Sequence, residues 1–572
     1  MICNMHPFTN IIICITIEIE NNINTEMFMN KKYRLTAMPL SLLMAFLFIF
    51  CGACTVIESN PDKGGEEEKP MQAEKVVNPL SFDDISETDD LKKFIAEVDN
   101  ADGSHNNDAK ETGTIISPYF LMEAEGKAVD CYAVRTSSGA HSFAMIDVGA
   151  QSFPIAVTVD LLYGAEYVNV LPQKYEVAAV TDKTGKATAE IPGYGNYTFV
   201  ADDNKETALT LMVREAEQYV VPEGYEEIRV EAGNHTEKLT FTAEKQVLYF
   251  EKGTHYLKYN IEFKNNTQVY LEEGCYIYAT MPDRTETPML DPAWSGKTRW
   301  NALFWGKGVK NVKIYGRGIV DLSKLDWHAR SAIMFESCQE VQVEGITLNN
   351  SPEWTIYFMG CRDITVREIL LFGYRQNSDG ICIADGADAL VENCFARSGD
   401  DLFEVKSMDG NCNIEIENII FRRCNGWPDK ARGMGIIYES VRDITDVRFE
   451  DCSIGYASAV WQDELGSLVV ILGGGAKVTN IVFEDIEIYS SALYPVNVTL
   501  YDIASAQIDG IYFKNLDIRG DKSVRVANNS AVGGTIENLY FEGCTRNGIL
   551  IESYARLALK LTDVDKTKIY ID

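Results

Sequence analysis

The stretch from Phe421 to Cys452, FRRCNGWPDKARGMGIIYESVRDITDVRFEDC, begins and ends with the same four-residue unit. In this unit an aromatic residue is followed three positions later by a cysteine or an aliphatic residue. The repeat length in this part of the chain is roughly 23 to 34 residues, and no helical periodicity separates the repeats. The unit occurs at Phe421–Cys424, Phe449–Cys452, Phe483–Ile486, Phe513–Leu516 and Phe541–Cys544.

This repeat decides the fold class. Leucine-rich repeats would show helical intervals, and propeller blades would need four strands per repeat. Short strands with loops of varying length instead predict an all-β chain whose residues 246–572 form a right-handed, single-stranded parallel β-helix. Inward positions stack in such a fold, so Cys424, Cys452 and Cys544 are expected to be free core thiols, with one or two disulfides left open elsewhere.

Residues 112–245 have a different pattern. Short alternating segments are separated by turn signals such as Asp182–Gly185, which predicts an N-terminal antiparallel β-sandwich. No catalytic cluster is found in it, so packing or a place at the substrate rim is its expected role. The alternating segments are Ser142–Val148, Ile155–Leu161, Tyr197–Val200 and Leu209–Val213.

Residues 1–54 read as a leader and an export signal. Basic residues precede the apolar run Leu40–Phe50, and Gly52 and Ala53 stand directly before Cys54. Small residues before a cysteine resemble the lipobox of bacterial lipoproteins, so Cys54 is the expected lipidation site. Residues 55–111 are polar and acidic and predict a tether. We therefore expect export and a lipid anchor in the bacterial cell envelope, at the outer membrane, as the membrane contact.

Charge and histidine content exclude several function classes. The net charge of −33 argues against nucleic acid as a partner, because phosphates need clusters of lysine and arginine. Only six histidines are present, and none follows His328. A catalytic triad or a histidine-rich zinc site is therefore unavailable in the C-terminal part of the chain. No cofactor and no metal are expected.

Two acidic motifs lie one repeat apart, Asn377-Ser-Asp-Gly380 and Gly399-Asp-Asp401. In a parallel β-helix this spacing brings Asp379, Asp400 and Asp401 to about one inter-strand distance, roughly 5 Å. Crowded carboxylates cannot all ionise easily, so one should keep its proton near neutral pH, and Asp400 is the expected holder. Glycoside hydrolysis needs such a division into acid and base. An isolated acidic cluster would more often be a calcium site or a solvated turn.

The two motifs together resemble those of β-helical glycoside hydrolases of families 28 (polygalacturonases) and 49 (dextranase and isopullulanase). The resemblance implies an inverting glycoside hydrolase in which Asp400 is the general acid and Asp379 and Asp401 activate water. It also implies that Lys406 is a substrate-binding residue or an electrostatic neighbour of the aspartates. Asn377 is a further expected substrate-binding residue. Arg375 and Arg432 flank the motifs, and either is expected to bind a sugar hydroxyl or to pair with an aspartate.

Two departures from the family 28 pattern bear on the substrate. Polygalacturonases carry Gly-His-Gly where this chain has Gly433-Met434-Gly435. Their Arg-Ile-Lys, which holds the uronate carboxylate, falls on Trp461-Gln-Asp463, where an acid would repel a uronate. A neutral polysaccharide is therefore expected, as the resemblance to family 49 implies, and that family also places a β-sandwich before its β-helix.

All seven tryptophans lie in sequence around the aspartates and none is in the sandwich. Aromatic faces pack on the C–H faces of sugars, so Trp354 and Trp461 are the expected platforms. Three alternatives stay open: a polygalacturonase-type pectin hydrolase, a calcium-dependent polysaccharide lyase, and a non-catalytic glycan-binding protein on the same fold. The tryptophans are Trp294, Trp300, Trp305, Trp327, Trp354, Trp427 and Trp461.

Overall fold

The chain is built almost entirely of strands. The computed structural model describes residues 75–83, 85, 94, 106–137, 139–150, 152–280, 289–290, 298–299, 302–501 and 505–572. Its short helical segments include α4 (Tyr554–Leu557) and the 3-10 turns at Gln173–Tyr175, Lys205–Thr207 and Lys566–Lys568. In the described part of the chain no helix has the length and apolar character that crossing a membrane requires.

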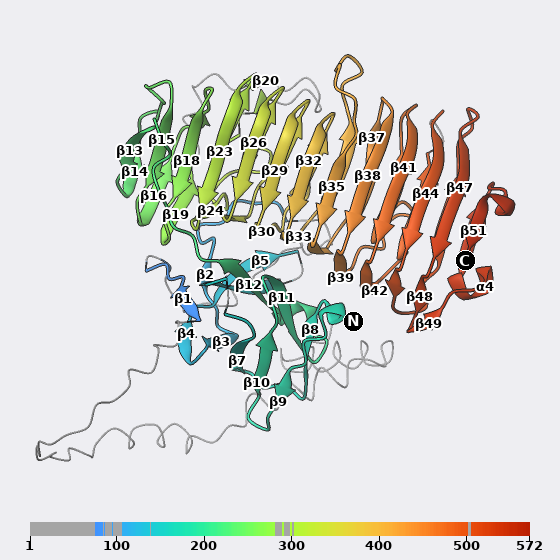
Figure 1. The fold of residues 1–572 in the computed structure, drawn as a ribbon, viewed down its shortest axis with the longest axis horizontal. Helices are drawn as coiled ribbons and strands as arrows, with labels where there is room; N and C mark the ends of the chain where they lie inside the picture. The colour runs from blue at the N-terminus through green and yellow to red at the C-terminus, as the bar shows by residue number, and fades with distance from the viewer. Residues whose placement is uncertain are drawn as a thin grey trace, which may run out of the picture. The chain divides into compact units, whose positions relative to one another are not determined.

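Three long sheets run side by side along the β-helix, and the coils follow one another from β13 to β51 in sequence order (Figure 1). Nearly every pairing in them is parallel. The first sheet holds β13 (Glu226–Val230), β15 (Gln246–Phe250), β18 (Thr267–Leu271), β23 (Lys310–Gly316), β26 (Gln339–Glu344), β29 (Arg362–Arg367), β32 (Ala387–Glu392), β35 (Ile419–Arg422), β38 (Ile444–Glu450), β41 (Lys477–Glu484), β44 (Gln507–Lys514), β47 (Thr535–Glu542) and β51 (Ile569–Ile571).

The second sheet also has 13 strands, and only its last pair, β48 with β49, is antiparallel. It holds β14 (Gly233–His235), β16 (Gly253–Leu257), β19 (Cys275–Ala279), β24 (Ile319–Asp321), β27 (Thr347–Asn349), β30 (Leu370–Phe372), β33 (Phe395–Ser398), β36 (Asn425–Pro428), β39 (Ser453–Ala457), β42 (Glu487–Ser491), β45 (Asp517–Ile518), β48 (Thr545–Arg546) and β49 (Ile549–Leu550).

The third sheet, of 11 strands, follows the second in each coil, and the loops between the two carry the candidate site. It holds β17 (Ile261–Glu262), β22 (Phe304–Lys307), β25 (Ile333–Glu336), β28 (Ile356–Met359), β31 (Ile381–Ala384), β34 (Phe403–Ser407), β37 (Met434–Ser440), β40 (Leu468–Leu472), β43 (Val496–Leu500), β46 (Val524–Asn528) and β50 (Leu559–Thr562).

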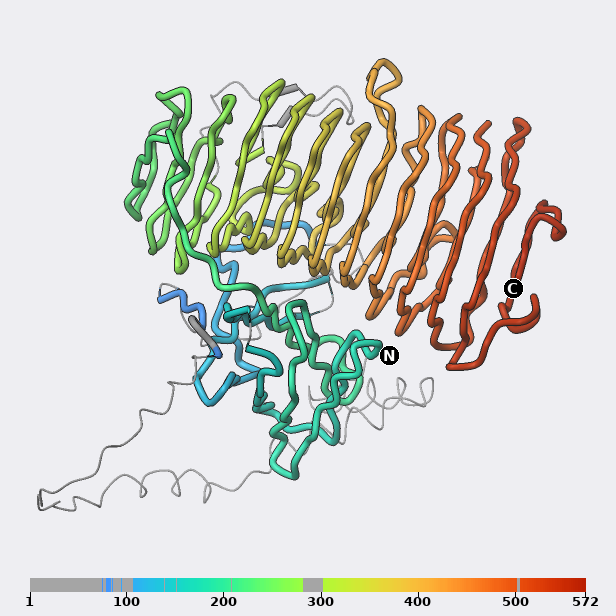
Figure 2. Tube along the Cα trace, viewed as in Figure 1, coloured from blue at the N-terminus to red at the C-terminus, as the bar shows by residue number. Residues whose placement is uncertain are grey.

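The repeat unit builds the core in the way that the sequence predicts. The trace winds through coil after coil in Figure 2. Equivalent side chains of successive coils stack on one another. Phe421, Phe449, Phe483, Phe513 and Phe541 form a ladder with successive ring centroids 4.9, 5.0, 5.3 and 4.7 Å apart. Burying such rings on one continuous core supplies the main favourable term in folding. The expected parallel β-helix is confirmed.

The cysteines also lie as expected. All ten in the described residues are free thiols, and nine of them are buried. At the turn between the first and second sheets, Cys394, Cys424 and Cys452 each donate to the carbonyl two residues earlier, at 3.3, 3.5 and 3.2 Å. The cysteine thus fills a small apolar position and satisfies a turn carbonyl.

The N-terminal sheets pack around their own apolar core. One has the order β2-β5-β6-β12-β11-β8 with β1 on β6, and the other has the order β4-β3-β7-β10-β9. Their bounds are β1 (Val76–Pro79), β2 (Ile115–Ile116), β3 (Phe120–Ala124), β4 (Lys127–Val129), β5 (Tyr132–Thr136), β6 (Gly139–Val148), β7 (Ile155–Leu161), β8 (Val168–Leu171), β9 (Val180–Thr181), β10 (Lys186–Ile191), β11 (Gly195–Ala201) and β12 (Leu209–Glu215).

The element boundaries differ from the expected domain limits at both ends of the sandwich. β1 lies inside the segment 55–111 that was expected to be a tether, since four residues are too few to show a strand periodicity. Parallel coils already begin with β13 at Glu226, before the expected limit at residue 246, because the first coils lack the aromatic repeat unit. The sandwich and the coils belong to one unit of the chain. The expected leader and Cys54 lie outside the described residues.

Candidate active site

The aspartates lie in the loops that lead into two neighbouring strands of the 11-stranded sheet. Asp379 precedes β31 and Asp400 and Asp401 precede β34, and Ile381 pairs in register with Phe403. The motif glycines allow close approach of the coils. A Cβ on Gly380 would stand 2.3 Å from the Leu402 carbonyl oxygen, and one on Gly399 would stand 2.4 Å from the Arg375 carbonyl oxygen.

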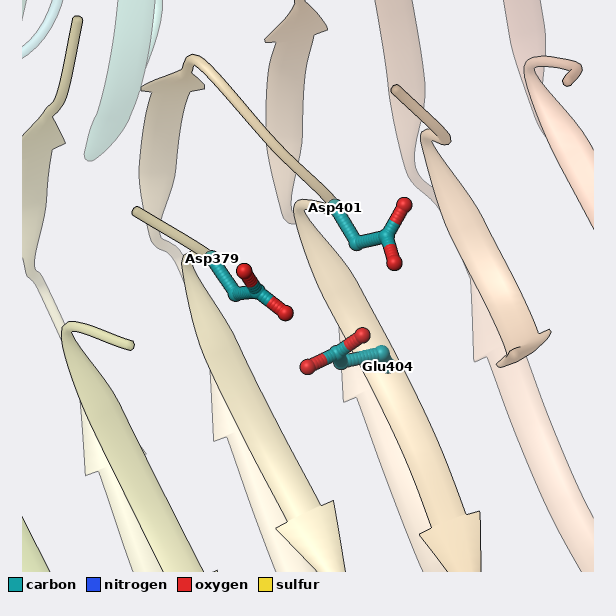
Figure 3. A group of neighbouring side chains, drawn as sticks. All are labelled: Asp379, Asp401 and Glu404. Atoms are coloured by element: carbon teal, nitrogen blue, oxygen red, sulfur yellow. The ribbon is translucent and has the colours of Figure 1, made fainter. Parts of the chain in front are cut away.

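A fourth carboxylate, that of Glu404, joins this group. Figure 3 shows the side chains of Asp379, Asp401 and Glu404 near one another on two neighbouring coils, and a carboxylate oxygen from each lies within 4.8 Å of the others. Sequence reasoning missed Glu404, although a signal was present. Phe403 and Val405 are core residues, so the period of two along β34 places Glu404 and Lys406 together on the outer face.

Lys406 is the cation at the centre of the cluster. Its Nζ lies 3.2 Å from Asp379 Oδ2, 2.9 Å from Glu404 Oε2 and 3.6 Å from Glu439 Oε2. Burial alone would lower its pKa, but the carboxylates of Glu404, Glu439 and Asp379 hold the pKa of Lys406 well above its ordinary value. The carboxylates of Asp379, Asp401 and Glu404 have the spacing of metal ligands. The Lys406 ammonium group is the cation that Asp379 and Glu404 bind.

The pKa values of the carboxyl groups rise mainly because the groups are buried. Burial, with Glu404 and Asp400 nearby, raises the pKa of Asp379 well above its ordinary value, although Lys406 opposes the shift. Burial raises the pKa of Glu404 to about 7, and burial with the Asp401 charge raises that of Asp400 to about 6. Protons are thus shared over the cluster, and the proton expected on Asp400 is one of several.

The contacts of Asp400 and Asp401 differ. Asp400 is half-buried, and its Oδ2 accepts the Asn377 backbone N–H at 2.8 Å. Asn377 has a φ of 61°, a left-handed conformation that asparagine tolerates well. Asp401 Oδ1 accepts the Arg432 N–H at 2.9 Å, and the Arg432 guanidinium lies 3.3 Å from Asp401 Oδ2. Arg432 is therefore placed to balance the charge of Asp401.

Two expectations need correction, and a third residue lies away from the site. Trp354 is only 2% exposed and lies under Lys406, whose Nζ is 4.2 Å from the ring centroid, so it supports the lysine and offers no open face to a sugar. Arg375 is fully buried and donates to the Ser323 carbonyl at 2.8 Å, so it stabilises loops and does not reach a ligand. Met434 pairs with Phe403 and points into the core, so it does not stand in the site.

Two exposed tryptophans lie in loops on either side of the aspartates. Trp461, expected as a platform, is 65% exposed, and its Nε1 donates to the Lys430 carbonyl at 2.6 Å. Trp327 is 37% exposed and donates to the Gln376 carbonyl at 2.9 Å, next to Asn377. Trp327 is therefore exposed to solvent on the side of the aspartates where Trp354 was expected to be exposed. A tryptophan's exposure depends on its loop, which sequence spacing does not reveal. Trp294 and Trp300 lie outside the described residues.

The segment before the sandwich reaches the site as well. Asn107 Oδ1 accepts the Gln376 N–H at 2.8 Å, and the Asp108 carbonyl accepts the Tyr374 hydroxyl at 2.6 Å. Lys110 N donates to the Ser323 carbonyl at 2.8 Å. Residues 107–110 were expected to belong to a tether, but here they are packed on the loop that carries Asp379, because their polar groups complete that loop's hydrogen bonds.

Comparisons with known proteins identify this part of the chain. Residues 292–504 match the model of Glycosyl hydrolases family 28. A protein named Probable polygalacturonase from Arabidopsis thaliana is 26% identical over 216 residues, which are 34% of this chain and 46% of that protein. Probable exopolygalacturonase B from Aspergillus flavus is 26% identical over 231 residues, 36% of this chain and 51% of that protein.

Among solved structures, Dex49A from Penicillium minioluteum aligns with a TM-score of 0.53 at 12% identity, covering 86% of this chain and 98% of that one. At this identity the likeness concerns the fold alone, and it extends over both the sandwich and the coils. The chain spans about half the length of the curated relatives it matches. The expected resemblance to β-helical glycoside hydrolases is confirmed, and residues 292–504, which hold Asp379, Asp400 and Asp401, are a domain of glycosyl hydrolases family 28.

Proposed function

We propose that the chain is a glycoside hydrolase that cleaves a polysaccharide with inversion at the anomeric carbon. The observation that carries the proposal is the cluster of Asp379, Asp401 and Glu404 beside half-buried Asp400, on a family 28 domain. Buried Lys406 pairs with Asp379 and Glu404 in this cluster. Glycoside hydrolysis needs one protonated and one ionised carboxyl group in a single site. A raised pKa of about 6 suits Asp400 to the role of proton donor.

In the proposed reaction Asp400 donates its proton to the glycosidic oxygen as the bond from that oxygen to the anomeric carbon breaks. Water attacks the anomeric carbon from the opposite face and gives a proton to the carboxylate of Asp379 or Asp401. Asp379 Oδ1 is buried and has no hydrogen-bond partner among the described residues, so it has an accepting position for that water. Arg432 balances Asp401 as the charge changes.

A neutral polysaccharide is the substrate that we propose first. The net charge of −33 and the exposed Asp463 carboxylate both disfavour a polyanion. The β-sandwich before the β-helix also agrees with the resemblance to family 49. A second candidate is a polygalacturonase-type hydrolase of pectin, which the names of the curated relatives favour.

Incubation with dextran, pullulan, galactan and polygalacturonate, with products followed by NMR, tests the reaction and the substrate. We expect new reducing ends from a neutral glycan, first appearing with the anomeric configuration opposite to that of the cleaved linkage. Cleavage of polygalacturonate alone would select the second candidate. Unsaturated products that disappear with a chelator would indicate a lyase, and binding without products a glycan-binding protein.

We also propose that the chain is exported and held at the bacterial cell envelope, at the outer membrane, by a lipid on Cys54. The support is the sequence pattern before that cysteine. Metabolic labelling with a fatty acid should mark the wild-type chain and leave Cys54→Ala unlabelled, with Cys51→Ala as the matched control. Equal labelling of both variants would contradict the assignment.

A further inference from the structure

A hollow of about 270 Å³ lies where the loops of the sandwich meet the coils. Its walls come from both parts of the chain: the sandwich contributes the turn after β5 and the turn before β12, and the coils contribute the loops before β37 and β40. The residues that line it include Ser137, Lys205, Asp429, Lys430, Ser458 and Trp461.

The hollow adjoins the proposed proton donor on the next coil. Ser398 pairs with Pro428 and Phe403 pairs with Met434, so Asp400 has Lys430 or Ala431 as its neighbour on the next coil. Strands of neighbouring coils lie about 4.8 Å apart. For a sugar chain that runs from coil to coil and has its linkage at Asp400, a neighbouring unit would lie over the loop that contains Lys430.

The floor of the hollow is fixed by buried charges. Asp429 is 5% exposed, and its carboxylate accepts from the Arg397 Nε at 3.1 Å and from the Ser137 N–H at 3.2 Å. The fully buried Arg397 also donates to the Lys205 carbonyl at 2.7 Å. This network ties the sandwich turns to the coil, so the groups around the hollow are held in place before a ligand arrives.

The groups above the floor are of the kinds that bind sugars in proteins, an exposed aromatic ring and hydrogen-bond donors. Trp461 exposes 65% of its surface, while its indole N–H is held by the Lys430 carbonyl, so the ring is oriented and open. Lys205 is half-buried, and its Nζ donates to Ser458 Oγ at 2.7 Å. Lysine donates and cannot accept, so the ligand must supply acceptor oxygens. An aromatic face beside such donors matches the apolar face and oxygen-rich edge of a pyranose.

We propose that this hollow is a sugar-binding subsite next to Asp400, in which the sandwich supplies Lys205 and the coils supply Trp461. The assignment of the bound unit to the substrate rests on the proposed function. The ligand is one glycosyl unit of the polysaccharide, presenting hydroxyl or carboxylate oxygens to the lysines. The sandwich is then part of the substrate site and contributes to affinity.

Titration calorimetry in the Asp400→Asn background tests the subsite, with isomaltohexaose and hexagalacturonate as probes. Trp461→Ala and Lys205→Ala should each weaken binding of the probe that binds by about tenfold, as expected for the loss of one stacked ring or one charge-assisted hydrogen bond. Tyr163→Ala and Lys183→Ala, exposed on the sandwich away from the hollow, are the matched controls. Thermal unfolding verifies that each variant is folded.

The outcomes separate the subsite from the reaction. Affinity unchanged in both Trp461→Ala and Lys205→Ala, in a chain that hydrolyses glycans, would overturn the subsite and leave the proposed function standing. Trp461-dependent binding in a wild-type chain without hydrolytic activity would support the subsite and overturn the function. In an active chain, the two variants should raise KM for long substrates and leave kcat nearly unchanged. Which probe binds distinguishes hydroxyl from carboxylate recognition.

Discussion

Replacing Asp400 by asparagine is expected to lower kcat on the natural polysaccharide by about 10²–10⁴-fold, the usual contribution of a general acid. Asparagine keeps an oxygen that can accept the Asn377 N–H, which Asp400 accepts at 2.8 Å, so the loop should keep its shape. What is lost is the proton for the leaving oxygen. A substrate with a leaving group that needs no protonation should therefore be cleaved by the variant at nearly the wild-type rate.

The pH dependence of the same variant gives an independent check. Burial and the neighbouring Asp401 charge raise the pKa of Asp400 to about 6, and the acid must be protonated to work. Wild-type kcat/KM should therefore fall as the pH rises through about 6, and this limb should be absent in Asp400→Asn. Asp446→Asn, exposed on β38 in a different sheet, is the control. An unchanged alkaline limb in Asp400→Asn would show that another group is the acid.

Much of this fold could be predicted because the repeat is regular. Phe421, Phe449 and their equivalents recur at coil spacing, and each ring must bury its surface against the next one. The same regularity brings Asp379 beside Asp401, since a motif repeated one coil later lands one strand away. Periodicity therefore predicts the residues whose position depends on the coil alone.

Residues whose role depends on which neighbours cover them could not be predicted in this way. Trp354 and Trp461 are equivalent in sequence terms, yet one lies under Lys406 and the other is open to solvent. Arg375 is close to the motif but turns into the loops, where residues 107–110 and Ser323 meet it. Glu404 is hard to predict for a different reason, because it lies between two core residues of β34, outside the acidic motif.

Replacing Lys406 by methionine is expected to lower the free energy of unfolding by about 3–5 kcal/mol, the usual effect of removing one partner of a buried ion pair. Asp379 and Glu404 would stay buried without their shared cation. The pKa values of both carboxyl groups should then rise further. A carboxyl group whose pKa is higher in the folded state than in the unfolded state makes its full contribution to stability at low pH, and this contribution is lost as the pH rises. Denaturant unfolding should show the loss growing from pH 5 to pH 8.

Activity should change in a characteristic way in this variant. The acidic limb of the pH profile is the ionisation of the base, Asp379, and the alkaline limb is the loss of the Asp400 proton. Lys406 lowers the pKa of both groups, so its removal should move both limbs to higher pH. Glu404→Gln should act differently, since Glu404 raises the pKa of Asp379. Its acidic limb should move to lower pH, with the alkaline limb nearly unchanged. Shifts of the same sign in the two variants would contradict this account of the cluster.

The double variant Glu404→Gln/Lys406→Met separates charge balance from packing. Burial raises the pKa of Glu404 to about 7, so the ionised group needs Lys406 most above that pH. With both charges removed, Asp379 is the one carboxyl of the two that is left without its cation. Part of the stability lost in Lys406→Met, the share that comes from Glu404, should therefore return at pH 8. A double variant as unstable as Lys406→Met would mean that the other contacts of the Lys406 ammonium, with Asp379 and with the Trp354 ring, and not its pairing with Glu404, hold this part of the coil together.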